Sequence, residues 1–246
     1  MSILRAEAVC KQYRMGEVIV DALCGVDLAI DQGEFVAIMG PSGSGKSSLL
    51  HLFGGLDTPT SGEIYLSGQA LSQLGDEELT LIRRRKVGFI FQFYNLIPTL
   101  NAWENVSLPL MIDGKPVFRR RKQIDDLLSL VGLGDRSDHR PDQLSGGQQQ
   151  RVAIARAFVN QPEIVLADEP TGNLDTRAGT AILELLQRSC RDLGATIVLV
   201  THDPRAASFA GRLIFLKDGR VENTLKNQAG ETSIGRIMAE MERLEA

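Results

Sequence analysis

The sequence predicts an α/β fold with a mostly parallel sheet, into which a helical segment is inserted. Residues Phe35–Met39 are almost wholly apolar and run straight into a glycine-rich loop, which is typical of a buried parallel strand. Strand and helix patterns alternate along much of the chain, and this order favours parallel strands joined by helices. Residues 94–160 instead show helical periodicity without a convincing strand pattern.

We therefore expect one domain over residues 1–246. Its α/β core would comprise residues 1–93 and 161–225, with residues 94–160 as a helical subdomain and residues 226–246 as a helical tail. In the tail, the apolar residues Ile234, Ile237, Met238, Met241 and Leu244 recur at helical spacing. This spacing predicts a C-terminal amphipathic helix with one packed face.

The elements follow in chain order. Ala22–Ile30 alternates apolar and polar residues, and Gly33 marks a turn before the strand at Glu34–Met39. Further strands are predicted at Glu63–Leu66, Val87–Phe91, Ile164–Ala167, Thr196–Thr201 and Leu213–Lys217. Helices are predicted at Gln123–Val131, Gln148–Val159 and Arg177–Leu193.

Composition excludes several classes of protein. The formal net charge of -4 argues against a nucleic-acid binder that relies on global positive charge, so we expect no nucleic-acid partner. The three cysteines form no CxxC pair, which favours small buried side chains in a reducing compartment. No secretory signal and no run of about 18 apolar residues occur, so work at a membrane would require docking on another chain.

Two basic runs, Arg83–Lys86 and Arg119–Lys122, fall on predicted helices. A solvated helix face explains such a run, and so does a position beside anionic lipid or an acidic partner. The three histidines lie far apart and show no metal-ligand spacing, which leaves core or surface roles for His51 and His139.

A phosphate-binding loop is predicted at Gly40–Ser47, which fits the pattern GxxxxGK[ST] and lies between an apolar strand and an apolar-rich helix start. Glycines let the backbone N–H groups turn inward, and the following helix presents its positive N-terminus. Lys46 would reach the β- and γ-phosphates, and the Ser47 hydroxyl would ligate Mg²⁺. A dinucleotide fold is disfavoured because the third glycine of GxGxxG is absent. The nucleotide-binding residues assigned here are Gly40, Pro41, Ser42, Gly43, Ser44, Gly45, Lys46, Ser47 and Ser48.

Two acids end a predicted buried strand at Ile164–Glu169. Asp168 is placed to hold the Mg²⁺ shell, and Glu169 is placed to polarise the attacking water as a general base.

A second anion-binding helix start is predicted at Leu144–Gln148. Ser145 is a good N-cap, and the glycines after it leave backbone N–H groups open to an anion. This loop has no lysine of its own, which raises the question of what it binds.

Taken together, these motifs resemble the ABC ATPase family over roughly residues 3–225. Gly40–Ser47 resembles its Walker A motif, Ile164–Glu169 its Walker B motif and Leu144–Gln148 its signature. The remaining matches are Gln92 at the Q-loop, Asn173–Asp175 at the D-loop, His202 as the switch histidine and Tyr13 as the adenine-stacking aromatic.

The resemblance implies an N-terminal antiparallel β subdomain and a head-to-tail dimer that sandwiches two ATP molecules with Mg²⁺. Ser145 and Gly147 would bind the γ-phosphate in trans, with Gly146 and Gln148 in the same loop. Gln92 would sense Mg²⁺ or the attacking water, and His202 would contact the γ-phosphate. Asp175 would help communication across the dimer.

The branch is indicated by Gly54–Gly62, Asn101–Pro109 and Ala167–Asp175, which resemble ATPases of lipoprotein release and of macrolide or peptide export. That branch implies separate transmembrane permease subunits, with this chain cytoplasmic and peripheral on the inner face of the cell membrane. The membrane partner would dock near Phe93–Asn105, where packing would also explain the aromatic residues. Gln148 departs from close relatives that carry Glu, and Ser48 stands where Thr is usual.

Two other functions stay open. A mechanotransmission complex would use the same ATPase without moving a substrate. A soluble ABC protein of DNA repair or translation is disfavoured, because the chain has neither long coiled-coil insertions nor a second cassette.

Overall fold

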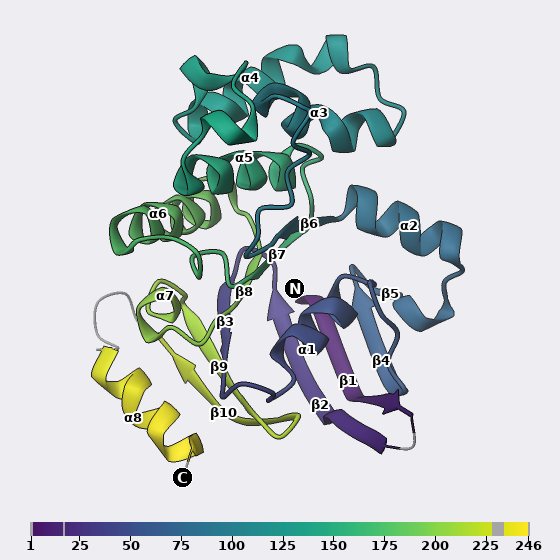
Figure 1. Ribbon diagram of the computed structural model, residues 1–246. Helices are drawn as coiled ribbons and strands as arrows, with labels where there is room; N and C mark the ends of the chain where they lie inside the picture. The colour runs from purple at the N-terminus through teal and green to yellow at the C-terminus, as the bar shows by residue number, and fades with distance from the viewer. Residues whose placement is uncertain (1, 17, 228–233, 246) are drawn as a thin grey trace.

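The computed structural model describes residues 2–16, 18–227 and 234–245, which form two β-sheets and a layer of helices (Figure 1). The smaller sheet is antiparallel, with strand order β2-β1-β4-β5. Its strands are β1 (Ser2–Met15), β2 (Val18–Asp31), β4 (Ser61–Leu66) and β5 (Gln69–Ala70). The antiparallel N-terminal subdomain is therefore confirmed, and β1 and β5 are elements that the sequence patterns did not delimit.

The larger sheet has strand order β10-β9-β3-β8-β7-β6 and is parallel except for β10, which pairs antiparallel with β9. Its strands are β3 (Phe35–Met39), β6 (Val87–Ile90), β7 (Ile164–Asp168), β8 (Ile197–Val200), β9 (Arg212–Lys217) and β10 (Arg220–Lys226). The predicted mostly parallel sheet is confirmed. Phe91, expected to end a strand, lies just beyond β6.

Each face of the larger sheet has its own apolar core, because successive residues of a strand point to opposite faces. On β3, Val36 and Ile38 pack with α1 (Lys46–Phe53) and the smaller sheet. Ala37 and Met39 pack on the opposite face, against the helical side. Four apolar side chains of α1 are at most 1% exposed, and burying each contributes about 1.5–3 kcal/mol.

The helical layer lies at the top of Figure 1 and contains α3 (Ala102–Ile112), α4 (Arg121–Leu130) and α5 (Gly146–Phe158). α3 begins with a reciprocal cap in which Asn101 accepts from the Glu104 N–H and Glu104 accepts from the Asn101 N–H. The sequence patterns did not delimit α3, since Pro109 interrupts its helical pattern, but the proline lies in its last turn, where the helix tolerates it. The division of subdomains at residues 94 and 160 stays a prediction.

The remaining helices flank the sheets. They are α2 (Asp76–Arg85), α6 (Thr176–Leu193), α7 (Pro204–Ala207) and α8 (Ile234–Glu245), with short 3-10 turns at Leu71–Gln73, Val117–Arg120, Gly134–Arg136 and Pro141–Gln143. α8 confirms the predicted C-terminal helix. Its packed face is narrower than expected, because Ile237 and Leu244 are buried while Ile234 and Met238 are largely exposed. Residues 228–233 of the predicted tail lie outside the described residues.

Candidate functional site

The glycines of the Gly40–Ser47 loop are required by its geometry. A Cβ on Gly40 would lie 2.0 Å from the Leu216 carbonyl oxygen, and a Cβ on Gly45 would lie 2.3 Å from the Ala22 carbonyl oxygen. Gly43 and Gly45 also have φ of 81° and 99°, a region that residues with a side chain rarely adopt. The loop between β3 and α1 can follow this path only with glycine at these positions.

The start of α1 is open to an anion. Its N-cap is Gly45, which has no side-chain cap, and no acidic residue occurs in its first turn, so no carboxylate of the helix itself caps the N–H groups there. Ser44 Oγ is buried and has no hydrogen-bond partner among the described residues, which is a costly arrangement unless a ligand supplies one. Pro41 and Ser48 are half-buried and Ser42 is exposed along the same loop.

Lys46 folds back over this loop. Its Nζ donates to the carbonyl oxygens of Gly40 at 2.8 Å and Pro41 at 2.7 Å. Burial lowers the pKa of Lys46 below its usual value, against the attraction of the Glu169 and Asp168 carboxylates. The loop glycines, the free helix start, the partnerless hydroxyl and this lysine together fit a nucleoside triphosphate.

The predicted metal ligands meet, although 121 positions separate them in the sequence. Ser47 Oγ donates to Asp168 Oδ1 at 3.3 Å, so a hydroxyl and a carboxylate oxygen lie together beside the phosphate loop. Burial raises the pKa of Asp168, opposed first by the nearby His51 and then by the Ser47 hydrogen bond. Oxygen donors of this kind are the ligands that Mg²⁺ prefers, so the pair fits that ion.

His51 was given no role beyond core or surface packing by its sequence position, yet it lies close enough to Asp168 to affect its pKa. It follows Ser47 by four residues on α1, and side chains at this spacing share one helix face. The spacing of four residues from Ser47 was the sequence signal that could have placed His51 near the predicted metal ligands.

Glu169 and His202 are in direct contact. His202 Nδ1 lies 2.6 Å from Glu169 Oε1, and the His202 backbone N–H donates to the same oxygen at 2.9 Å. Thr201 Oγ1 donates to Glu169 Oε2 at 3.0 Å, a contact that the sequence patterns did not indicate. Glu169 has a left-handed backbone with φ of 44°, held by its N–H bond to the Val200 carbonyl.

Gln92 lies over the turn that follows Glu169. A Cβ on Gly172 would come within 2.7 Å of Gln92 Nε2, and Asn173 Nδ2 donates to the Gln92 carbonyl at 3.0 Å. Gln150 of α5, buried and not singled out by sequence, donates to the Pro170 carbonyl at 2.6 Å. The segment after β6 and the segment after β7 are thus tied to the helical layer.

The Leu144–Gln148 loop is a capped helix start, as predicted. Gln148 Oε1 accepts from the Ser145 N–H at 2.9 Å, and Ser145 Oγ accepts from the Gln148 N–H at 3.4 Å. Gly146 lies beneath the Tyr94 hydroxyl, and a Cβ on Gly147 would lie 3.2 Å from the Ala178 Cβ. Gln148, although uncharged, thus accepts the hydrogen bond from the Ser145 N–H that completes this cap.

Asp175 accepts from the Ala178 N–H at 2.9 Å and so caps α6 beside that loop. Tyr13 lies on β1, where its hydroxyl donates to Asp57 Oδ2 at 3.0 Å and Lys11 Nζ lies 5.0 Å from its ring centroid. Its stacking on a base stays a prediction.

The structure therefore brings together one group of predicted residues and leaves another apart. Ser47, Gln92, Asp168, Glu169 and His202 lie at or just beyond the carboxyl ends of β6, β7 and β8 or at the start of α1, where open α/β sheets bind ligands. In Figure 1, α5 lies in the helical layer at the top, well separated from α1 in the core. The start of α5 is thus separate from the residues gathered around the phosphate loop.

Fold and site together define a P-loop nucleoside triphosphatase. Residues 23–172 match the family model described as ABC transporter. The chain is 53% identical over 214 residues to an uncharacterized ABC transporter ATP-binding protein of Thermotoga maritima, covering 87% of this chain and 91% of that protein. A second such protein, MJ0796 of Methanocaldococcus jannaschii, is 51% identical over 228 residues, covering 91% and 97%.

The chain is also 52% identical over 219 residues to the macrolide export ATP-binding/permease protein MacB of Brucella melitensis, of which it spans only 34%. Among solved structures, the chain is similar to the MJ0796 ATP-binding cassette, which was solved as a dimer in a post-hydrolysis state bound to ADP and Pi. The TM-score is 0.84 at 50% sequence identity, and the match covers 92% of this chain and 99% of that one. The chain belongs to the ABC transporter ATP-binding family, and it is an ATPase.

Proposed function

We propose that two copies of this chain close head to tail around two ATP molecules and drive separate membrane subunits. The observation that carries this proposal is the presence of two helix starts suited to an anion in one chain, of which only α1 begins with a lysine and contacts Asp168. Since α1 and α5 lie in different layers, a second copy is the natural source of the missing half. The dimeric MJ0796 cassette supports this arrangement.

Within each site, the residues divide the work. Lys46 and the N–H groups of the loop bind the β- and γ-phosphates, and Ser145 with Gly147 of the other copy covers the γ-phosphate. Ser47 and Asp168 hold Mg²⁺, which supplies charge neutralisation at the phosphates when bound. Tyr13 packs on the base.

Glu169 accepts a proton from the attacking water. Its carboxylate is oriented by Thr201, which contacts one oxygen, and by His202, which contacts the other oxygen twice. His202, 71% exposed at its side chain, is free to reach the γ-phosphate from the same position. Gln92, tied to the turn after Glu169, relays the state of the site to the helical layer, and Asp175 relays it across the dimer.

A groove of about 420 Å³ beside Gln92 suits a membrane partner. Apolar residues of β6 and α3, such as Phe89 and Ile112, line it together with three arginines, and its described lining contains no acidic residue. Phe93, just outside, is 72% exposed. An amphipathic segment with an acidic side chain would complement this lining.

The MacB relatives carry ATP-binding and permease functions in one protein, of which this chain matches 34%. The likeness to MacB supports export, and the branch motifs in the sequence extend this proposal to lipoprotein or lipid extrusion by separate membrane subunits. Among the described residues, no helix combines the length and apolarity needed to cross a bilayer. We place the chain on the cytoplasmic face, held there by its partner.

ATP-driven dimerisation tests the proposal. Glu169→Gln should retain ATP and Mg²⁺ and sediment as a dimer, because only the water-activating step is weakened. Adding Ser145→Arg should return the protein to a monomer that still binds a fluorescent ATP analogue. A Glu169→Gln protein that stays monomeric with ATP, or a double variant that still dimerises, would refute the head-to-tail sandwich.

Membrane association tests the partner. Ile112→Asp places a charge in the apolar part of the groove and should release the tagged chain from native membranes without loss of basal ATPase activity. Phe118→Asp is the matched control, because Phe118 is 76% exposed outside the groove lining. Recovery of the wild-type chain only on ribosomes or DNA would contradict the transporter assignment.

A further inference from the structure

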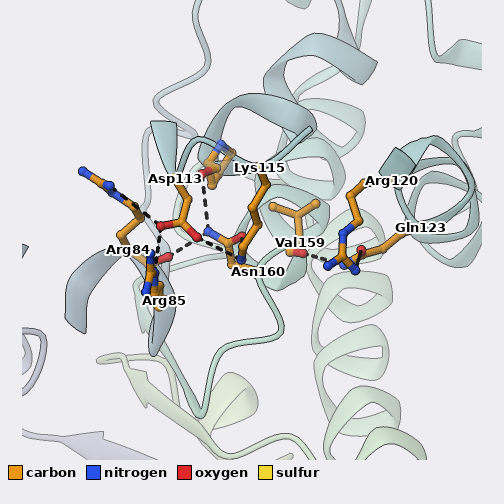
Figure 2. A network of polar contacts seen from close by, with 9 residues as sticks. Arg84, Arg85, Asp113, Lys115, Arg120, Gln123, Val159 and Asn160 are labelled. Atoms are coloured by element: carbon orange, nitrogen blue, oxygen red, sulfur yellow. Dashed lines mark hydrogen bonds and ion pairs between the residues drawn. The ribbon is translucent and has the colours of Figure 1, made fainter. Parts of the chain in front are cut away.

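A buried carboxylate joins α2 to the helical layer. Asp113, directly after α3, pairs with Arg85 Nε at 2.8 Å and Lys115 Nζ at 3.0 Å, and Arg84 Nη1 lies 3.8 Å away (Figure 2). The side chains of the basic run Arg83–Lys86 thus have partners within the chain. Arg83 donates to the Gly55 carbonyl, and Lys86 pairs with Glu163.

Asp113 is a fixed negative charge. Its side chain has 0% exposed surface, and although burial opposes ionisation, the hydrogen bonds from Arg85 and Lys115 outweigh it and keep its pKa below the usual value. The carboxylate is enclosed although Arg85 is 55% exposed, so removal of the Asp113 charge would leave Arg84, Arg85 and Lys115 without the carboxylate that holds them together.

Asn160 adds a neutral link at the same junction. Its Nδ2 donates to the Arg84 carbonyl at 2.8 Å, and its Oδ1 accepts from Lys115 Nζ at 3.1 Å. Figure 2 shows this amide between the Asp113 cluster and the end of α5. The chain therefore leaves the helical layer at a residue fastened to α2.

α5 connects this junction to the signature loop. It begins directly after Ser145 and ends at Phe158, two residues before Asn160. Its 13 residues span about 20 Å, so a tilt of about 10° at the Asn160 end moves the signature loop by about 3.5 Å. Hydrogen bonds to a phosphate do not survive a displacement of that size.

We propose that Asp113 is a positioning residue, whose ion pairs with α2 hold the helical layer at the angle at which Ser145–Gln148 meets the phosphate bound by a second copy. This inference rests on the proposed head-to-tail dimer. It assigns a function to a charge cluster outside the nucleotide-binding loop.

The test introduces Asp113→Asn into the Glu169→Gln protein and measures its ATP-dependent dimerisation by sedimentation. The dimer should be about tenfold weaker, within the range for members of one charge network, while binding of a fluorescent ATP analogue by the monomer is unchanged. Asp135→Asn is the matched control, because it removes a carboxylate of the same layer that is 77% exposed and pairs with Arg136.

The outcomes separate positioning from stability. Lower Tm with dimerisation within twofold of the parent, at a temperature where circular dichroism shows a folded protein, would overturn the inference. If Asp113→Asn does not fold, Arg85→Gln takes its place with the same expectation. A parent that fails to dimerise with ATP overturns the proposed function, and this inference with it.

Discussion

The two helix starts of this chain, Gly45–Lys46 at α1 and Ser145–Gly146 at α5, use the same backbone chemistry in different surroundings. The first has a lysine of lowered pKa and an aspartate of raised pKa, and the buried Ser44 hydroxyl has no partner in the described part of the chain. The second satisfies itself through a reciprocal cap of neutral side chains. The start of α1 therefore carries the charged and polar groups that suit an anion, whereas the start of α5 is stabilised by its own cap.

The largest effect should come from the catalytic carboxylate near the first helix start. Glu169→Gln keeps the side-chain shape but cannot accept the proton, so kcat should fall about 10²–10⁴-fold. ATP affinity of the monomer should stay close to that of the wild type. Steady-state ATPase assays and a binding titration measure the two quantities, and normal turnover would show that Glu169 is not the base.

Next in size is the lysine. Lys46→Ala should weaken ATP binding by about 10–100-fold, since hydrogen bonds to charged groups contribute about 1.5–3 kcal/mol. Isothermal titration with ATP and Mg²⁺ measures this loss, with Lys122→Ala as an exposed control. An unchanged ATP affinity would mean that Lys46 does not distinguish the start of α1 from the start of α5.

The second helix start should respond differently. Ser145→Ala removes the N-cap and should cost about 1 kcal/mol of unfolding free energy. It should weaken ATP-driven dimerisation in the Glu169→Gln background but leave ATP binding by the monomer unchanged. Chemical denaturation and sedimentation measure these quantities. If Ser145→Ala weakened ATP binding by the monomer as much as Lys46→Ala does, the two helix starts would not have different roles in ATP binding.

The smallest effect concerns pH. Because the pKa of Asp168 is raised in the folded protein, its ionised form opposes folding at neutral pH, and this cost disappears as pH falls through the raised pKa. Asp168→Asn should therefore raise Tm at pH 7 by about 1–3 °C without nucleotide, with a smaller gain at pH 5. Asp142→Asn, an exposed carboxyl before the signature loop, controls for lost charge. A lower Tm at pH 7 would contradict this sign.

Much of the fold was predictable because the spacing of apolar residues within each segment indicates its secondary structure. The buried strand Phe35–Met39, the helices α5 and α6 and the tail helix α8 all follow patterns within their own segments. The hairpin to β10 was missed although the sequence has Asp218-Gly219, a strong signal for a tight turn. α3 was missed because a proline near its end interrupts the pattern.

The sequence by itself determined the phosphate loop, the acid pair and the capped signature, since each depends on neighbours within a few residues. Only the tertiary structure decided which distant groups meet. In the folded chain Glu169 contacts His202, and His51 lies near Asp168. Arg84 and Arg85, which the sequence left as a candidate surface run, are partners of Asp113. Local spacing fixes which face of a helix a side chain occupies, but packing fixes what that face meets.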